Sequence, residues 1–197
     1  STSLTVTVPT SAIYAPITIV DLSTGLVTNS KAYFTPTFTP IKTNLVAADF
    51  AAPENFSSNY NPTSITVGDL DLDGKPDLVV ANYYTGDISI YRNTSTSGTI
   101  NSSSFATKED FYVGGNPTSI AIGDLDGDSK PEIVVANAGS YSINIFNNYS
   151  SSGSIFFNQV ADIYTADEPT FVAIGDLDTD GKFDLVVANR YTASISV

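Results

Sequence analysis

The sequence predicts an all-β fold made of repeated four-stranded units. Residues that favour strands, the β-branched and aromatic types, are plentiful, whereas helix-favouring runs of Ala, Glu, Lys and Leu are missing. Apolar and polar residues alternate over short stretches that are bounded by Ser, Thr, Asn and Gly. One long segment occurs three times, at spacings of 55 and 52 residues, and this self-similarity indicates a repeat architecture.

The composition excludes some kinds of chemistry and disfavours some kinds of binding partner. Cys is absent from the chain, which excludes a disulfide framework and thiol chemistry. The net charge of -13 argues against nucleic acid and anionic membrane, since both bind through Lys and Arg, and favours cations instead. No stretch approaches the ~18 consecutive apolar residues of a membrane span, and Ser1 does not begin a signal peptide. We therefore expect a soluble segment, and because Met is absent we expect it to be processed, truncated or only partly observed.

The first expected domain covers residues 1–40 and contains only three or four strands. "LTVTVP" predicts a strand, and a Pro-bounded turn and a hairpin around Ser23 to Gly25 follow it. With "PITI" and "STGLVTNS", the segment resembles the C-terminal half of an IPT/TIG immunoglobulin-like domain, a type that often precedes repeats in bacterial surface proteins. Half a sandwich exposes an apolar face and open edges, so missing strands would come from upstream residues or another chain. A self-sufficient hairpin cap is the alternative, although isolated hairpins are marginally stable.

The second expected domain, residues 41–197, contains the repeats. A strand at about 44–51 precedes them, and the three units cover about 61–112, 116–165 and 168–197. Each unit has a strand such as "SITVGD", a second such as "DLVVAN", an alternating third strand, and a fourth that the last unit lacks. Four short strands fit a propeller blade better than a solenoid turn. The almost continuous apolar run of the second strand predicts burial on both faces, between neighbouring blades.

Three units predict an incomplete ring, because closed propellers have about four or more blades. We expect the strand at 44–51 to complete a blade elsewhere, either in the C-terminal continuation of the same chain or in a neighbouring copy. The second option would produce a head-to-tail assembly, and such a contact builds a filament when it does not close.

A group of acidic residues lies between the first two strands of every unit. These acids occupy positions one, three, five and nine of loop 1 (69–77), loop 2 (124–132) and loop 3 (176–184). Carboxylates crowded into one turn repel each other, and a bound cation removes that conflict. Alternating oxygen ligands, with Gly74 or Gly181 at position six, are typical of calcium loops, in which position seven supplies its backbone carbonyl. The predicted metal ligands are Asp69, Asp71, Asp73, Lys75 and Asp77; Asp124, Asp126, Asp128, Lys130 and Glu132; and Asp176, Asp178, Asp180, Lys182 and Asp184.

The loops differ from helix-loop-helix calcium sites in one detail, and loop 2 differs from the other two loops in another. Position twelve is always Val, where a bidentate Glu would be needed, so the ninth residue must close the coordination shell. In loop 2, Ser129 at position six would need a left-handed conformation, and Glu132 is longer than Asp. The alternative is that Asp and Gly merely form turns, but a turn does not need four acids in three successive units.

The repeated units resemble the FG-GAP and VCBS repeats of integrin-type β-propellers. This resemblance covers about residues 43–197 and includes the acidic loop and the strands on both sides of it. It implies about three calcium ions, one per loop, in structural and non-catalytic sites. It also implies a secreted or cell-surface protein, here of bacterial type, that is used for adhesion, ligand binding or assembly.

The function that we expect is that of a non-enzymatic extracellular structural or adhesive segment, as a subunit of a surface filament or of a large adhesin. Catalysis is disfavoured because His and Cys are absent and most acids lie in the loops. Acid pairs such as Glu109 with Asp110 could in principle hydrolyse glycosides, but they more simply form solvated strand edges. Expected partners are calcium and another protein or copies of the same chain.

The alternative function is a carbohydrate- or protein-binding module. Four tyrosines follow the second strands of the units, in places where aromatic rings could stack on sugars: Tyr83, Tyr84, Tyr141 and Tyr191. Packing between blades is the competing explanation for these rings.

Overall fold

The computed structural model describes residues 18–20, 27–29, 46–96 and 98–197. The chain divides into two units, Ser1–Ala52 and Pro53–Val197. In the first unit, β1 (Thr18–Val20) pairs antiparallel with β2 (Val27–Asn29). The rest of the expected immunoglobulin-like segment, residues 1–40, lies outside the described residues. The IPT/TIG resemblance and the domain boundary near residue 40 therefore stay predictions.

The structure differs from the strand expected at residues 44–51. Ala47–Asp49 form a short 3-10 helix, η1, and the Phe50 amide donates to the Ala47 carbonyl at 3.2 Å. The Phe50 side chain is exposed, so no sheet face favours an extended backbone at that residue. Residues 44 and 45 lie outside the described part of the chain. The stretch from 46 to 51 does not form the expected outer strand.

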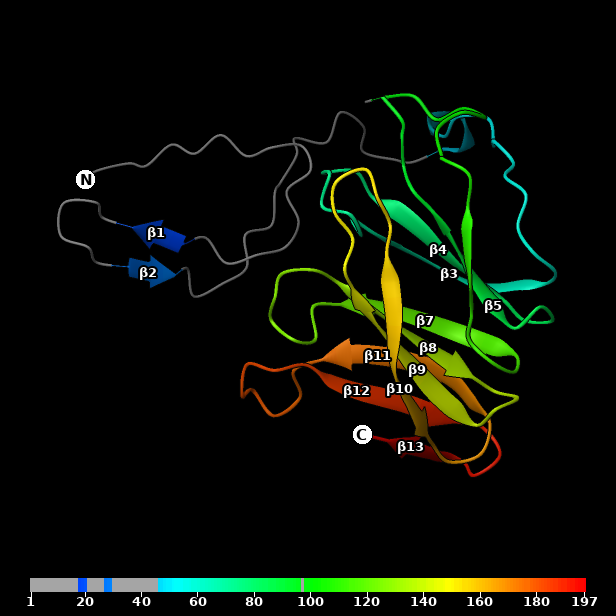
Figure 1. The fold of residues 1–197 in the computed structure, drawn as a ribbon, viewed down its shortest axis with the longest axis vertical. Coiled ribbons are helices and arrows are strands. Elements are labelled where there is room, and N and C mark those ends of the chain that lie inside the picture. The colour runs from blue at the N-terminus through cyan, green and yellow to red at the C-terminus, as the bar shows by residue number, and fades with distance from the viewer. Residues whose placement is uncertain (1–17, 21–26, 30–45, 97) are drawn as a thin grey trace. The chain divides into compact units, whose positions relative to one another are not determined.

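The second unit contains three antiparallel sheets, which we call blades 1, 2 and 3 (Figure 1). Blade 1 consists of β3 (Pro62–Gly68), β4 (Asp77–Asn82), β5 (Asp87–Tyr91) and β6 (Glu109–Tyr112). Blade 2 consists of β7 (Pro117–Gly123), β8 (Glu132–Asn137), β9 (Ser142–Asn148) and β10 (Phe157–Tyr164). Blade 3 consists of β11 (Pro169–Gly175), β12 (Asp184–Asn189) and β13 (Ser194–Ser196). In each blade, neighbouring strands along the sheet are also consecutive in sequence.

The blades pack face against face through two apolar clusters. One cluster joins blade 1 to blade 2 and includes Val79, Ile88 and Ile133. The other joins blade 2 to blade 3 and includes Val134 and Val172. All residues of β8 are buried, because this strand belongs to the middle blade and is covered on both faces. The prediction of burial from its apolar run is thus confirmed.

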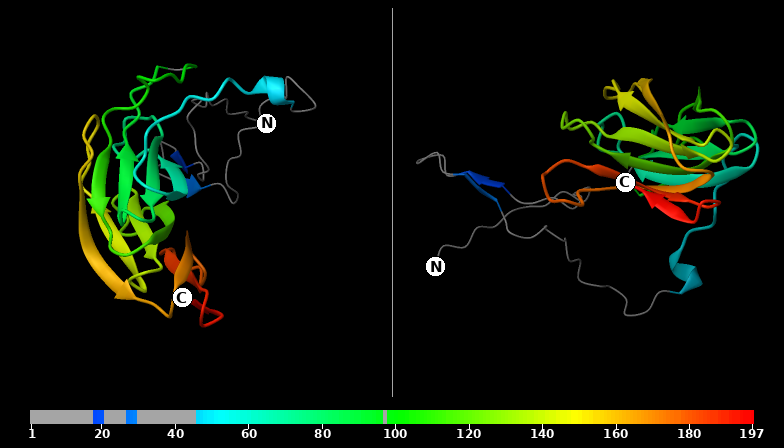
Figure 2. Two further views of the ribbon diagram at one scale, coloured as in Figure 1. Left: turned by 90° about the vertical axis from the view of Figure 1, so that its right-hand side faces the viewer. Right: turned by 90° about the horizontal axis from the view of Figure 1, so that it is seen from below.

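The three blades form an open array and not a closed ring, as Figures 1 and 2 show for the described residues. The predicted all-β class, with three blades of an incomplete propeller, is confirmed. No helix in the part of the chain that the structure describes has the length and apolar character needed to cross a membrane.

Candidate metal centres

Loops 1, 2 and 3 each bring three carboxyl groups together. In every loop these are the acids at positions one, three and nine, and one oxygen from each lies within 4.8 Å of the others. Position one follows the first strand of the blade and position nine begins the second, so the sheet fixes both ends of the loop. The trios are Asp69, Asp71 and Asp77; Asp124, Asp126 and Glu132; and Asp176, Asp178 and Asp184.

Backbone amides hold the trio of each loop in place. In loop 1 the Leu70 amide donates to Asp77 Oδ2 at 2.9 Å, and the Gly74 amide donates to Asp69 Oδ2 at 2.9 Å. The same two bonds recur in loops 2 and 3 between the corresponding residues. The Asn93 amide, two residues after β5, donates a 2.7 Å hydrogen bond to Asp77 Oδ1. The ninth residue is therefore anchored from two sides before any ion is considered.

Left-handed backbone conformations shape the turns at two positions. Position six has φ of 86° at Gly74 and 73° at Ser129, so the expectation that a residue with a Cβ adopts this conformation in loop 2 is confirmed. Position four is left-handed as well, with φ of 58° at Leu72 and 65° at Thr179. Sequence reasoning missed position four in loops 1 and 3, because Leu and Thr carry no signal for positive φ; loop 2 has Gly127 there, with φ of 81°.

The acids at position five do not join the trios. Asp73 instead accepts a 2.9 Å hydrogen bond from the Lys75 amide, and its Oδ2 lies 3.7 Å from Lys75 Nζ. Asp128 and Asp180 accept the equivalent bond from the amide of position seven. Their assignment as metal ligands, and that of the carbonyls at position seven, stays a prediction.

In loops 1 and 2 burial raises the pKa of the ninth residue. Asp77 is 0% exposed, and burial raises its pKa from 3.8 to about 6. Hydrogen bonds from the Asn93 and Leu70 amides oppose this rise, while the charges of Asp71 and Asp69 add to it. Burial likewise raises the pKa of Glu132 in loop 2. Among the described residues no salt bridge reaches a trio, and the one ion pair within the loops joins Lys75 to Asp73 at position five of loop 1.

Loop 1 is also covered by the following blade. Asn148 Nδ2 donates to the Leu70 carbonyl at 2.9 Å, and the Gly153 amide donates to Asp71 Oδ2 at 2.7 Å. Asp71 is consequently buried, whereas its counterparts in the later loops, Asp126 and Asp178, are exposed. Sequence reasoning missed both donors, since they lie about eighty residues beyond loop 1. The only sequence signal is that of Asn148, which holds the position in its repeat that Asn93 holds in the first repeat.

The remaining candidate residues are dispersed. Asp110, one member of an acid pair considered for catalysis, is bonded to Lys108 and Ser89; burial alone would raise its pKa, but these bonds and the lysine charge lower it. Tyr84 is 66% exposed, and its ring centroid lies 5.5 Å from that of Tyr60. Tyr141 and Tyr191 are exposed as well, and only Tyr83 is half-buried. Packing between the described blades therefore does not explain the exposed rings.

Comparison with known proteins gives one family match. The model of a family described as an FG-GAP-like repeat matches residues 69–135 and 124–187, which together exceed half of the chain. No curated protein matches. Seven chains of solved structures match. One is the crystal structure of BBS1N in complex with ARL6DN, soaked with lead, at 17% identity and a TM-score of 0.35. The match covers 71% of this chain and 56% of that chain, so this chain spans a little over half its length.

Proposed function

Because the chain belongs to the FG-GAP-like repeat family, we propose that it is a calcium-stabilised structural or adhesive segment that works outside the cell and without catalysis. Such repeats are typical of extracellular, adhesion-type modules. The proposal extends to a secreted bacterial surface protein whose blades bind another protein or copies of the same chain in a filament or adhesin.

The observation that carries this proposal is the recurrence of one trio in all three blades. Each trio offers only carboxylate oxygens, which are hard ligands of the kind that calcium binds. Amide donors already occupy several of the carboxylate oxygens, so the loop is ordered around a fixed set of negative charges. A buried carboxylate with a raised pKa, such as Asp77, is a group whose charge needs a cation.

Several residues of the loops fit a calcium ion. The trio would hold the ion, with the acid at position five and the carbonyl at position seven as the further ligands that we propose. Bound calcium would supply positive charge to the turn. The chain itself contributes the orientation: the ninth residue belongs to the second strand, so neutralising it fixes the junction between the first two strands of the blade.

Calcium titration of the full chain tests this function. We expect about three binding events per chain in calorimetry and a higher melting temperature with calcium than with chelator. Binding to the native state at ~100 times the dissociation constant adds ~2.7 kcal/mol per site to the free energy of unfolding. A triple variant, Asp77→Asn with Glu132→Gln and Asp184→Asn, should no longer show a higher melting temperature with calcium than with chelator.

A matched control removes three charges elsewhere. Glu109, Asp162 and Asp167 are exposed acids outside the loops, and their replacement by Gln, Asn and Asn should leave the calcium response intact. An unchanged melting temperature of the wild-type chain across saturating calcium and chelator contradicts the proposed function.

A carbohydrate-binding role is the second candidate, and the exposed ring pair favours it. Tyr60 and Tyr84 lie in contact on the surface, and the ring of Tyr83 lies 5.2 Å from that of Tyr84. Exposed tyrosine faces are suited to stacking on sugar rings. A glycan panel read by tyrosine fluorescence tests this role: Tyr84→Ala should abolish the response and Tyr164→Ala, also exposed, should not. Absence of any response in the wild-type chain contradicts it.

A further inference from the structure

The contact between successive blades follows one pattern that occurs twice. We call the side of a blade that meets the following blade its back face, and the side that meets the preceding blade its front face. A Cβ atom placed on Gly68 of blade 1 would lie 3.4 Å from Ile122 of blade 2. A Cβ atom placed on Gly123 of blade 2 would lie 3.2 Å from Ile174 of blade 3. Each back face thus has a glycine socket, and each following front face fills it with Ile.

We call the contact between two successive blades a seam. The same hydrogen bond occurs at equivalent positions in both seams. Thr63 Oγ1 donates to the Pro117 carbonyl at 2.9 Å, from blade 1 to blade 2. Thr118 Oγ1 donates to the Pro169 carbonyl at 3.0 Å, from blade 2 to blade 3. The seam therefore has a donor on the back face and a carbonyl acceptor on the front face, at equivalent positions of the repeat.

The back face of blade 3 has all of these parts, and the described residues leave it open. A Cβ atom placed on Gly175, the equivalent of Gly68 and Gly123, would meet nothing within 4 Å. Thr170 Oγ1 donates within its own blade, to the Ala188 carbonyl. Ile195, whose counterparts Ile88 and Ile143 are buried in the two seams, is 71% exposed. An apolar face of the kind that the first two blades bury is here exposed to solvent.

The front face of blade 1 is the complementary half. Ile65 and Val67 are 61% and 59% exposed, although their equivalents in blade 2, Ile120 and Ile122, pack in the first seam. Pro62 is exposed as well, whereas Pro117 is buried. The first blade therefore presents the apolar side chains and the proline carbonyl that a back face contacts.

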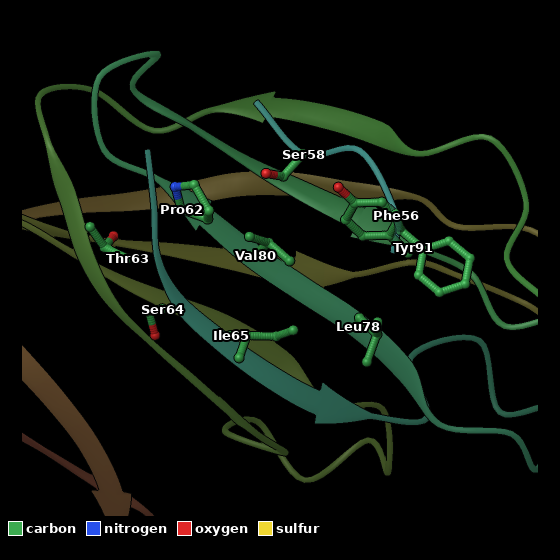
Figure 3. A pocket seen from close by; sticks show the side chains of 9 residues that line it. All are labelled: Phe56, Ser58, Pro62, Thr63, Ser64, Ile65, Leu78, Val80 and Tyr91. Atoms are coloured by element: carbon green, nitrogen blue, oxygen red, sulfur yellow. The ribbon is translucent and has the colours of Figure 1, made fainter. Parts of the chain in front are cut away.

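A groove on this front face matches a substitution on the open back face. The groove has a volume of about 390 Å³ and is lined mainly by apolar groups, among them Ile65, Val80 and Tyr91 (Figure 3). Blades 1 and 2 have Ser64 and Ser119 at the position where blade 3 has Phe171, which is 59% exposed. In the second seam the Ser119 hydroxyl accepts from the Val172 amide at 3.3 Å, and Val172 is the equivalent of Ile65. In a contact that repeated this seam, the Phe171 ring would lie against Ile65 and the groove.

We propose that the front face of blade 1 binds the back face of blade 3 of a second copy of this chain. In this head-to-tail contact Val67 fills the Gly175 socket, Thr170 donates to the Pro62 carbonyl, and Phe171 enters the groove. The occupant is identified by continuity, because the contact repeats the two seams that already exist within the chain. The inference deepens the proposed assembly role and rests on it, but it does not depend on calcium. Two copies supply six blades, within the range of about four to eight found in closed propellers.

Sedimentation velocity of the full chain over a range of concentrations tests the contact. We expect the wild-type chain to self-associate, and we expect a front-face variant, Ile65→Asp, and a back-face variant, Ile195→Asp, each to be monomeric. Because each variant keeps one intact face, mixing the two should restore a 1:1 complex. Val160→Asp, a half-exposed residue at the bulge of β10, is the control and should associate like the wild type.

A second back-face variant keeps the test valid if the Asp variants fail to fold. Gly175→Ala adds a Cβ atom that meets nothing within 4 Å inside one copy, so it should keep its melting temperature while weakening self-association at least tenfold. A wild-type chain that stays monomeric overturns the inference, and so does a mixture of the two variants that forms no complex. If only this inference fails, the melting temperature still rises with calcium; if only the calcium role fails, association persists without that rise.

Discussion

The Gly153 amide donates a 2.7 Å hydrogen bond to Asp71 Oδ2, across 82 residues and from blade 2 to the acidic loop of blade 1. Asp71 is 0% exposed as a result of this cover. One member of the first trio is therefore tied to the seam between two blades. Asp178 occupies the same position in loop 3 and is exposed.

This difference predicts unequal effects of two matched substitutions. Asp71→Ala removes the buried carboxylate that accepts from the Gly153 amide, and a hydrogen bond to a charged group contributes ~1.5–3 kcal/mol. Asp178→Ala removes the equivalent carboxylate at an exposed position. Both variants should lose one calcium event in calorimetry, but in chelator only Asp71→Ala should lower the free energy of unfolding in urea titrations. Equal losses for the two variants would contradict the coupling.

The raised pKa of Asp77 predicts a pH dependence of the metal-free protein. Its pKa is about 6 in the folded state and ~3.9 in an unfolded chain, so between these values the folded state binds more protons. The free energy of unfolding then decreases as pH rises, by about 1 kcal/mol between pH ~5 and ~7. Urea titrations in chelator measure this change, and Asp77→Asn should remove most of it. An increase in stability from pH ~5 to ~7 in the wild-type chain, unaltered in the variant, would show that Asp77 does not control it.

Two glycines at equivalent positions should respond differently to a methyl group. In Gly123→Ala the new Cβ lies 3.2 Å from two atoms of Ile174 in the next blade, and overpacking costs ~1–3 kcal/mol. In Gly175→Ala the Cβ meets nothing within 4 Å, and Ala in a strand is more stable than Gly by ~0.5–1 kcal/mol. Thermal melting should therefore fall for the first variant and stay level or rise for the second. A lower melting temperature for Gly175→Ala than for Gly123→Ala would contradict the close contact between Gly123 and Ile174.

Asn93 and Asn148 occupy equivalent positions in the first two repeats and provide a further pair of substitutions. Asn148 Nδ2 donates to the Leu70 carbonyl of blade 1 and to the Pro131 carbonyl of its own blade, whereas Asn93 Nδ2 donates only within its blade, to the Pro76 carbonyl. Asn148→Ala should lower the free energy of unfolding by ~1–3 kcal/mol more than Asn93→Ala does, because it leaves the buried Leu70 carbonyl unpaired across the seam. Calorimetric melting of both variants checks the difference, which should vanish if the inter-blade bond contributes nothing.

The blades and loops were predictable because their signals are local. Strand β8 is an uninterrupted apolar run, and the acids of loop 1 stand at fixed spacings, so period and composition suffice to place them. The 3-10 helix at Ala47–Asp49 was not predictable, since a short alternating stretch becomes a strand only when a neighbouring sheet pairs with it.

Local sequence patterns do not predict the contacts that complete the site. Gly153 and Asn148 reach loop 1 only after two blades have stacked, and nothing near them in sequence indicates an acidic partner. The position-five acids stay a prediction: their spacing matches a ligand, and Asp73 also bonds to the Lys75 amide of its own turn. Spacing identifies the loop, while hydrogen bonds decide which of its oxygens converge.

The shielding of a turn by the blade that follows it gives the array a polarity. Asp71 is buried, whereas Asp126 and Asp178 are exposed to solvent. A chelator or acid would therefore reach the carboxylates of loops 2 and 3 before those of loop 1. The carboxylate of Asp71 is reached only when blade 2 separates from blade 1, so loop 1 should be the last of the three loops to give up a bound ion.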